Sequence, residues 1–212
     1  MKHYRRMSMR KNLWRALILA FLLAPNPAPV RAQTMQSDWP CKQVRVPEIA
    51  LASVWTGPSI ESERKRWRDD PAVSELVAKI APRRTPLEEA ERRIDDFAKA
   101  GGNDKSRMTL LFAALYEKMN DERRDVVNGL DRFGGRLKEM AEKTRQETQS
   151  FYELQNQKPV DPEAVRKAAE ALQWRVRLFD EQRKMVSYVC ESPALIEQRF
   201  GALARRIISK ME

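Results

Sequence analysis

From residue 104 onward the apolar residues recur at steps of three and four, which is the spacing of one face of an α-helix. Counted with their polar fillers, they fit a seven-residue repeat with one stutter before Phe133. Gly134 and Gly135 follow the stutter, and the pattern leaves open whether the helix breaks there. The first long helix is therefore expected between Asp104 and about Gln157, on these apolar positions: Met108, Phe112, Leu115, Met119, Val126, Leu130, Phe133, Leu137, Met140, Phe151 and Leu154.

A returning helix is expected after a turn at residues 158–161, with Asp161 as its cap and Pro162 as its first residue. Ser192-Pro193 is expected to end it and to begin a last amphipathic helix. The first helix would extend roughly 80 Å and the returning one about 43 Å, so residues 130–157 pair with 162–190 as an antiparallel hairpin. The face of the returning helix that is expected to pack against the first helix is called its seam. It consists of Val165, Ala169, Leu172, Val176, Phe179, Arg183, Val186 and Cys190.

Shorter helices are expected before residue 104. Asp70-Pro71 begins one of them, and residues 85–88 (Thr-Pro-Leu-Glu) read as a capping box with proline at the first helical position. Gly101-Gly102 ends that second helix, after which Asn103 or Asp104 caps the long one. Residues 59–68 form a further helical candidate.

Residues 33–58 are expected to be an extended strap, because Pro40, Pro47 and Pro58 interrupt every periodic pattern. Its apolar residues are numerous for a free linker, so we expect them to lie along the helices: Trp39, Val44, Val46, Ile49, Leu51, Val54 and Trp55. The predicted fold is all-α. It comprises this strap and a helical bundle over 59–212, from which an antiparallel coiled-coil hairpin projects at about 130–190.

Residues 1–32 read as a secretory signal peptide. A basic start precedes an apolar run of nine residues, 16–24, and a proline-rich stretch ends in Val30-Arg31-Ala32. Cleavage is expected between Ala32 and Gln33, giving a periplasmic or secreted protein. The alternative is an uncleaved membrane anchor, although a bilayer span needs about 20 apolar residues.

Removing the signal changes the charge of the chain. Seven of its 40 Lys and Arg residues lie in residues 1–32, which hold no acidic residue, so 33 basic residues then face 30 acidic ones. The basic excess of the whole chain thus belongs mainly to the export segment, and nucleic acid is not an expected partner.

Two cysteines remain, Cys41 and Cys190, in a compartment that oxidises thiols. A disulfide between them is the default expectation, and it would stabilise the fold by about 5 kcal/mol in the chain-entropy model. Two free thiols or an intermolecular bridge are the alternatives.

Catalytic chemistry finds little support. The one histidine, His3, lies in the signal segment, so triads with an imidazole base are excluded from the mature chain. The adjacent carboxylate pairs at 69–70, 88–89 and 95–96 do not face the same way on a helix, and surface roles are expected for them. The glycine pairs lack the context of a phosphate loop. No cofactor and no metal ion are expected, and the four mature tryptophans are expected to pack in the core or strap.

The polar stretch 144–150 interrupts the apolar seam near the expected tip of the hairpin. A weakly packed tip can flex or accept a partner, which makes Thr144, Arg145, Glu147 and Thr148 candidate partner-binding residues. The alternative is a thin hairpin that simply tolerates polar residues.

Three segments, Trp39-Pro40-Cys41, Val54-Trp-Thr-Gly-Pro58 and Tyr188-Val-Cys-Glu191, resemble an uncharacterised family of exported bacterial helical proteins. The resemblance covers most of the mature chain and implies no activity. It implies that the two cysteine segments belong to one disulfide-tied unit.

The sequence favours a non-enzymatic periplasmic protein that acts by protein-protein interaction, as an adaptor or accessory subunit for envelope proteins. The alternatives are a holdase-like chaperone with coiled-coil arms, a peripheral membrane-binding protein, and an enzyme that uses carboxylates alone. The basic face of the last helix could bind anionic lipid. The favoured interpretation is that this face is the solvent-exposed side of a helix packed on the bundle. The sequence does not fix the oligomeric state.

Overall fold

The computed structural model describes residues 38–212, and the predicted signal peptide with its cleavage between Ala32 and Gln33 lies outside them. Within this range the chain is all-α, and no strand is present. The helices are η2 (Leu51–Ser53), α2 (Glu63–Arg66), η3 (Trp67–Asp69), α3 (Pro71–Ile80), α4 (Leu87–Ala100), α5 (Lys105–Asn156) and α6 (Pro162–Ile208).

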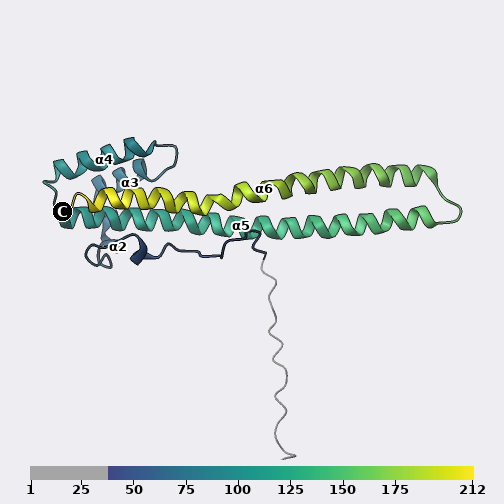
Figure 1. Cartoon of the computed structure of the whole chain (residues 1–212), viewed down its shortest axis with the longest axis horizontal. Helices are drawn as coiled ribbons and strands as arrows, with labels where there is room; N and C mark the ends of the chain where they lie inside the picture. The colour runs from purple at the N-terminus through teal and green to yellow at the C-terminus, as the bar shows by residue number, and fades with distance from the viewer. Residues whose placement is uncertain (1–37) are drawn as a thin grey trace, which may run out of the picture. The chain divides into compact units, whose positions relative to one another are not determined.

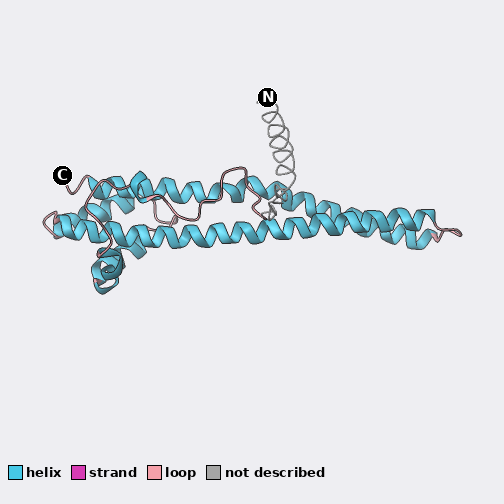
Figure 2. Ribbon diagram, turned by 90° about the horizontal axis from the view of Figure 1, so that it is seen from below, coloured by secondary structure: helices cyan, strands magenta, loops and turns pink. Residues whose placement is uncertain are grey.

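The two long helices, α5 and α6, lie antiparallel and side by side, and the short helices gather where α5 begins and α6 ends (Figures 1 and 2). Large side chains from α3, α4, α5 and α6 fill the core at that end. Trp55 of the strap enters this core and stacks on Phe112, with 3.8 Å between ring centroids, and Phe112 also contacts Phe200. By contrast, no residue from 135 to 189 is fully buried. Two helices alone cannot enclose a side chain, so this distal pair remains thin.

The local signals at the helix starts are confirmed. The carboxylates of Asp70, Asp104 and Asp161 each accept a hydrogen bond from a backbone N–H in the first turn, and Pro71 and Pro162 begin their helices. Asn103 instead adopts a left-handed conformation next to Gly102, which also has positive φ, and so makes the turn that Asp104 then caps.

The capping box predicted at residues 85–88 is wrong. Helix α4 begins at Leu87 with Pro86 before it, and no side chain caps its first turn. The hydroxyl of Thr85 donates instead to the carbonyl of Lys79, 2.8 Å away, and so satisfies a carbonyl at the end of α3. Residues 59–68 are helical only in part, over α2 and the start of η3.

The helix break predicted at Ser192-Pro193 is also wrong, because α6 continues through Pro193 to Ile208. A proline inside a helix removes one backbone hydrogen bond and costs about 3 kcal/mol. Here tertiary contacts hold both sides of it: Pro193 is buried, its carbonyl accepts from the guanidinium of Arg123, and Cys190 is tied to the strap. Helix α5 likewise runs without a break through Gly134 and Gly135.

The strap is held by side chains of α5. The amide oxygen of Asn120 accepts from the N–H of Ile49 (2.8 Å), and the hydroxyl of Tyr116 donates to the carbonyl of Ile49 (3.0 Å). The expectation that all its apolar residues pack is only partly right. Ile49 and Trp55 are buried, but Val44 is 81% exposed and Val46 is exposed as well.

Candidate protein-interaction surface

The outer face of α6 exposes four large apolar side chains in one line. Trp174, Tyr188 and Leu195 follow at intervals of fourteen and seven residues, and Met185 lies eleven residues, about three turns, after Trp174. Their exposed fractions are 65%, 68%, 43% and, for Met185, 46%. We call these four residues the α6 stripe. It runs for about 32 Å along the helix.

The stripe continues a face of α6 that is covered closer to the C-terminus. Arg199, four residues after Leu195, donates to the carbonyls of Ile80 (2.7 Å) and Ala81 (2.9 Å) at the end of α3. Seven residues further on, Arg206 pairs with Asp95 of α4. Helices α3 and α4 therefore cover this face up to about Arg199, and the stripe is the part beyond their edge (Figure 1).

The covered part is held by charge as well as packing. The carboxylate of Asp95 accepts from Arg206 (Nε to Oδ1, 2.7 Å) and lies 3.1 Å from Lys210 Nζ. The hydrogen bond from Arg206 is the main reason that the pKa of Asp95 lies below its usual range, and it raises the pKa of Arg206 in turn. Burial lowers the pKa of Arg199, whose guanidinium caps the end of α3.

Charged side chains of both signs flank the stripe. Four of them lie beside the stripe on the helix surface: Arg177, Glu181, Lys184 and Glu191. None of these four forms an ion pair within residues 38–212. Other charged residues on the two long helices pair locally, as Arg166 does with Glu163 and Glu170. Some, such as Arg132, also lack an ion pair in the described part of the chain. The flanks of the stripe thus carry charge that the folded chain leaves uncompensated.

The predicted partner-binding residues divide between two environments. Thr144, Arg145 and Thr148 line a shallow groove on α5 together with Tyr152 and Asn156. The hydroxyls of Thr144 and Thr148 donate to carbonyls one turn back, and Arg145 pairs with Glu142. Glu147 lies elsewhere, because it pairs with Arg175 across the two helices at 2.7 Å. Thr144, Arg145 and Thr148 therefore share one surface of α5, whereas Glu147 joins α5 to α6.

The disulfide joins the strap to α6 beside the stripe. Cys41 and Cys190 are bonded, with 5.6 Å between their Cα atoms, and the described residues contain no free cysteine. Cys190 is buried two residues after the exposed Tyr188, so the strap lies on one side of α6 and the stripe on another. The bridge also fixes the position of residues 185–195 relative to α5.

The carboxylate pairs have ordinary partners. Asp70 caps α3, Glu89 pairs with Arg93, and Asp95 pairs with Arg206. Within residues 38–212, no cluster of three or more Cys, His, Asp or Glu side chains could hold a metal ion. Over the same range, no helix is both long and apolar enough to cross a membrane.

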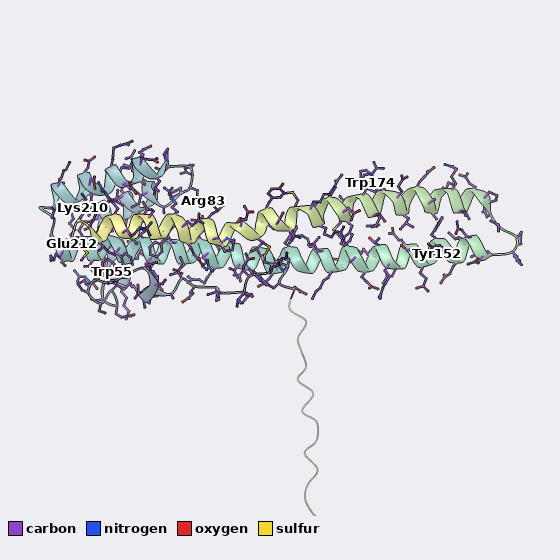
Figure 3. The ribbon with its side chains drawn as sticks, viewed as in Figure 1. Trp55, Arg83, Tyr152, Trp174, Lys210 and Glu212 are labelled. Atoms are coloured by element: carbon purple, nitrogen blue, oxygen red, sulfur yellow. A yellow bond between two sulfur atoms is a disulfide. The ribbon has the colours of Figure 1, made fainter. Side chains whose placement is uncertain are left out.

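Trp174 is the residue that the sequence interpretation misplaced most, since all four tryptophans were expected to pack. Trp55 is buried and Trp39 and Trp67 are partly buried, but Trp174 stands exposed on the distal part of α6, on the helix opposite Tyr152 (Figure 3). A signal was present: Trp174, Tyr188 and Leu195 form a second seven-residue series, displaced by two residues from the seam through Leu172 and Val186.

No family model, no curated protein and no solved structure matches this chain. The resemblance drawn from three sequence segments, at residues 39–41, 54–58 and 188–191, remains a prediction.

Proposed function

We propose that this protein is an exported, non-enzymatic interaction protein of the cell envelope, an adaptor or accessory subunit, and that it binds another protein chain along the outer face of α6. The exposed α6 stripe carries this proposal. Trp and Tyr are enriched where proteins bind one another, because they bury a large area at low cost in side-chain entropy. Export follows from the predicted signal peptide, and the Cys41–Cys190 disulfide is compatible with an oxidising compartment.

The chemistry of the expected occupant is that of an amphipathic helix. Helices α3 and α4 already cover the same face of α6 beyond Arg199, so this face is built to pack against helices. A partner helix with apolar residues at heptad spacing would extend that layer over Leu195, Tyr188 and Trp174. Its flanking residues would have to meet charges of both signs on α6.

A lipid surface is supported less well. Residues 162–195 hold six basic and five acidic residues, which leaves α6 almost neutral along the stripe. Amphipathic helices that lie on anionic membranes carry a clear basic excess beside their apolar face. The near balance of charge favours a protein partner.

The proposal is tested by capturing the tagged protein from cells after chemical crosslinking, with two matched variants. Trp174→Ser/Tyr188→Ser removes both aromatic side chains of the stripe, and Tyr152→Ser removes an equally exposed aromatic side chain from α5. We expect a defined crosslinked protein adduct with the natural chain and with Tyr152→Ser, and its loss with the stripe variant. An adduct that persists in the stripe variant and disappears with Tyr152→Ser would instead assign binding to the groove at Thr144 and Thr148.

A further inference from the structure

The charges beside the α6 stripe are self-complementary. When α6 is laid antiparallel on a second α6, with a two-fold axis between Met185 and Tyr188, Tyr188 faces Met185 of the second copy and Met185 faces its Tyr188. In the same register Lys184 lies near the second copy's Glu191 on both sides of the axis. Tyr188 and Met185 are equidistant from the axis. Lys184 and Glu191 differ in their distance from it by two residues, about 3 Å, which their long side chains can span.

Each of these pairings is favourable. A thioether next to an aromatic ring contributes about 0.3–1.5 kcal/mol, and Lys184 and Glu191 have no ion-pair partner within residues 38–212. We infer that the chain bound at the α6 stripe is a second copy of this protein, which crosses the first between Met185 and Tyr188 about a two-fold axis. This inference rests on the proposed function, since it names the occupant of the same surface.

The position of α3 and α4 fixes how the copies can meet. A parallel arrangement would press the two α3–α4 layers against each other, because both layers cover the same face of α6 beyond Arg199. An antiparallel crossing separates them to opposite ends. At the common interhelical angle of about 50°, each layer passes beside the hairpin of the other copy instead of colliding with it.

The size of the contact sets the expected strength. A crossing centred on Met185 and Tyr188 buries less than about 1,200 Å² in total, which is the range of weak and transient interfaces. We therefore expect a dimer that dissociates at about micromolar concentration, not an obligate one. Each chain should fold on its own, since the core of Phe112, Phe200 and Trp55 is complete within one copy.

The test is light scattering of the exported protein across a concentration series, with two charge reversals. Lys184→Glu places like charges at both contacts, and so does Glu191→Lys. We expect the natural chain to approach the mass of two copies at high concentration, and each variant alone to dimerise at least tenfold more weakly. An equimolar mixture of the two variants should dimerise again, because in the mixed dimer one cross-copy pair keeps its native signs and the other is reversed, so both are attractive. Arg132→Glu, an exposed position on α5, is the control and should leave dimerisation unchanged.

A natural chain that stays monomeric at every concentration overturns the inference. So does a dimer that ignores both reversals, or a mixture that fails to restore it. The proposed function fails separately: a monomer that still forms a stripe-dependent adduct with a different protein in cells overturns the second copy as occupant and leaves the interaction role intact. Absence of any stripe-dependent protein adduct overturns that role.

Discussion

Arg123 joins three segments of the chain through one buried side chain. Its guanidinium donates to the carbonyls of Val46 (2.9 Å) and Pro193 (3.2 Å) and pairs with Glu197 at 2.5 Å, while its side chain is only 6% exposed. This one guanidinium on α5 thus binds both the strap and α6. The apolar periodicity of α5 gave no indication of this role, because the arginine lies between two apolar positions and its acceptors are 70 or more residues away.

Arg123→Ala is therefore expected to lower the free energy of unfolding by about 2–3 kcal/mol, since it removes a buried donor from the carbonyls of Val46 and Pro193 and the ion-pair partner of Glu197. The adjacent Arg124 is the matched control. It is exposed and pairs with Glu48, so Arg124→Ala should cost less than about 0.5 kcal/mol. Chemical denaturation of both variants measures the difference. Equal costs would mean that the buried hydrogen bonds of Arg123 contribute nothing.

Asp95 gives the protein a pH dependence at its α4–α6 contact. Because its folded pKa is depressed, chiefly by the hydrogen bond from Arg206, Asp95 stabilises the fold at pH values above its unfolded pKa of about 3.9. This stabilisation is lost as the pH falls through the lower, folded pKa. Asp95→Asn should be less stable than the natural chain near pH 7, and the difference should shrink below about pH 4.

Thermal unfolding of both proteins between pH 3 and pH 7 checks this. Asp96→Asn is the control, because Asp96 is exposed and has no ion pair within residues 38–212. A difference in Tm between Asp95→Asn and the natural chain that stays constant from about pH 3 to pH 7 would contradict a stabilising role for the ionised Asp95.

At the level of elements, the helix starts were predictable because an N-cap is a local device: an aspartate followed by proline satisfies the first-turn N–H groups without help from distant residues. Helix continuity was not predictable on the same basis. Whether Pro193 ends a helix depends on Arg123 and on the disulfide at Cys190, which lie far away in sequence. Thr85 likewise bonds to Lys79 where a local rule assigns it to the following helix.

Gly134 also has a role that spacing alone did not reveal. The carbonyl of Asp38 passes so close to Gly134 that a Cβ at this position would overlap it, while a Cβ on Gly129 would meet only the side chain of Arg132 at 3.8 Å. The start of the strap therefore requires a glycine in the middle of α5, and this contact explains a glycine that otherwise weakens the helix.

Gly134→Ala should displace residues 38–40 and raise their rate of hydrogen exchange and proteolysis, whereas Gly129→Ala should stabilise the protein by about 0.5–1 kcal/mol through helix propensity. Hydrogen exchange with peptide-level resolution measures the first effect and chemical denaturation the second. Unchanged protection of the strap in Gly134→Ala would contradict the close approach.

For the whole molecule, the disulfide closes a loop with a sequence separation of 149. The chain-entropy model assigns such a loop about 5 kcal/mol of stabilisation. Cys41→Ser/Cys190→Ser should lose up to that amount, measured by denaturation, while the contacts of Ile49 and Trp55 keep residues 47–58 in place. Limited proteolysis should then cut the strap before residue 47 and spare it afterwards. Cleavage spread over residues 47–58 would show that the disulfide holds the whole strap.

The all-α class and the antiparallel return of the second long helix could be predicted, because the apolar periodicity indicates helices and a short turn joins the two long ones. The length of the return was predicted wrongly, since α6 continues through Pro193 to Ile208. The interaction surface could not, since the candidate residues at the hairpin tip were chosen for polarity within the seam. The surface that stands out in the structure, the α6 stripe, lies off the seam and becomes visible only when the cover provided by α3 and α4 is known to end near Arg199.

The central claim is that another protein chain covers the α6 stripe in the cell, and oxidative footprinting of the unmodified protein tests it most directly. Trp174, Met185 and Tyr188 are all reactive toward hydroxyl radicals, and Tyr152 provides an internal reference on α5. We predict that the three stripe residues are oxidised several-fold less in intact cells than in dilute purified protein, while Tyr152 reacts equally in both. Equal oxidation of the stripe in the two settings would contradict the account.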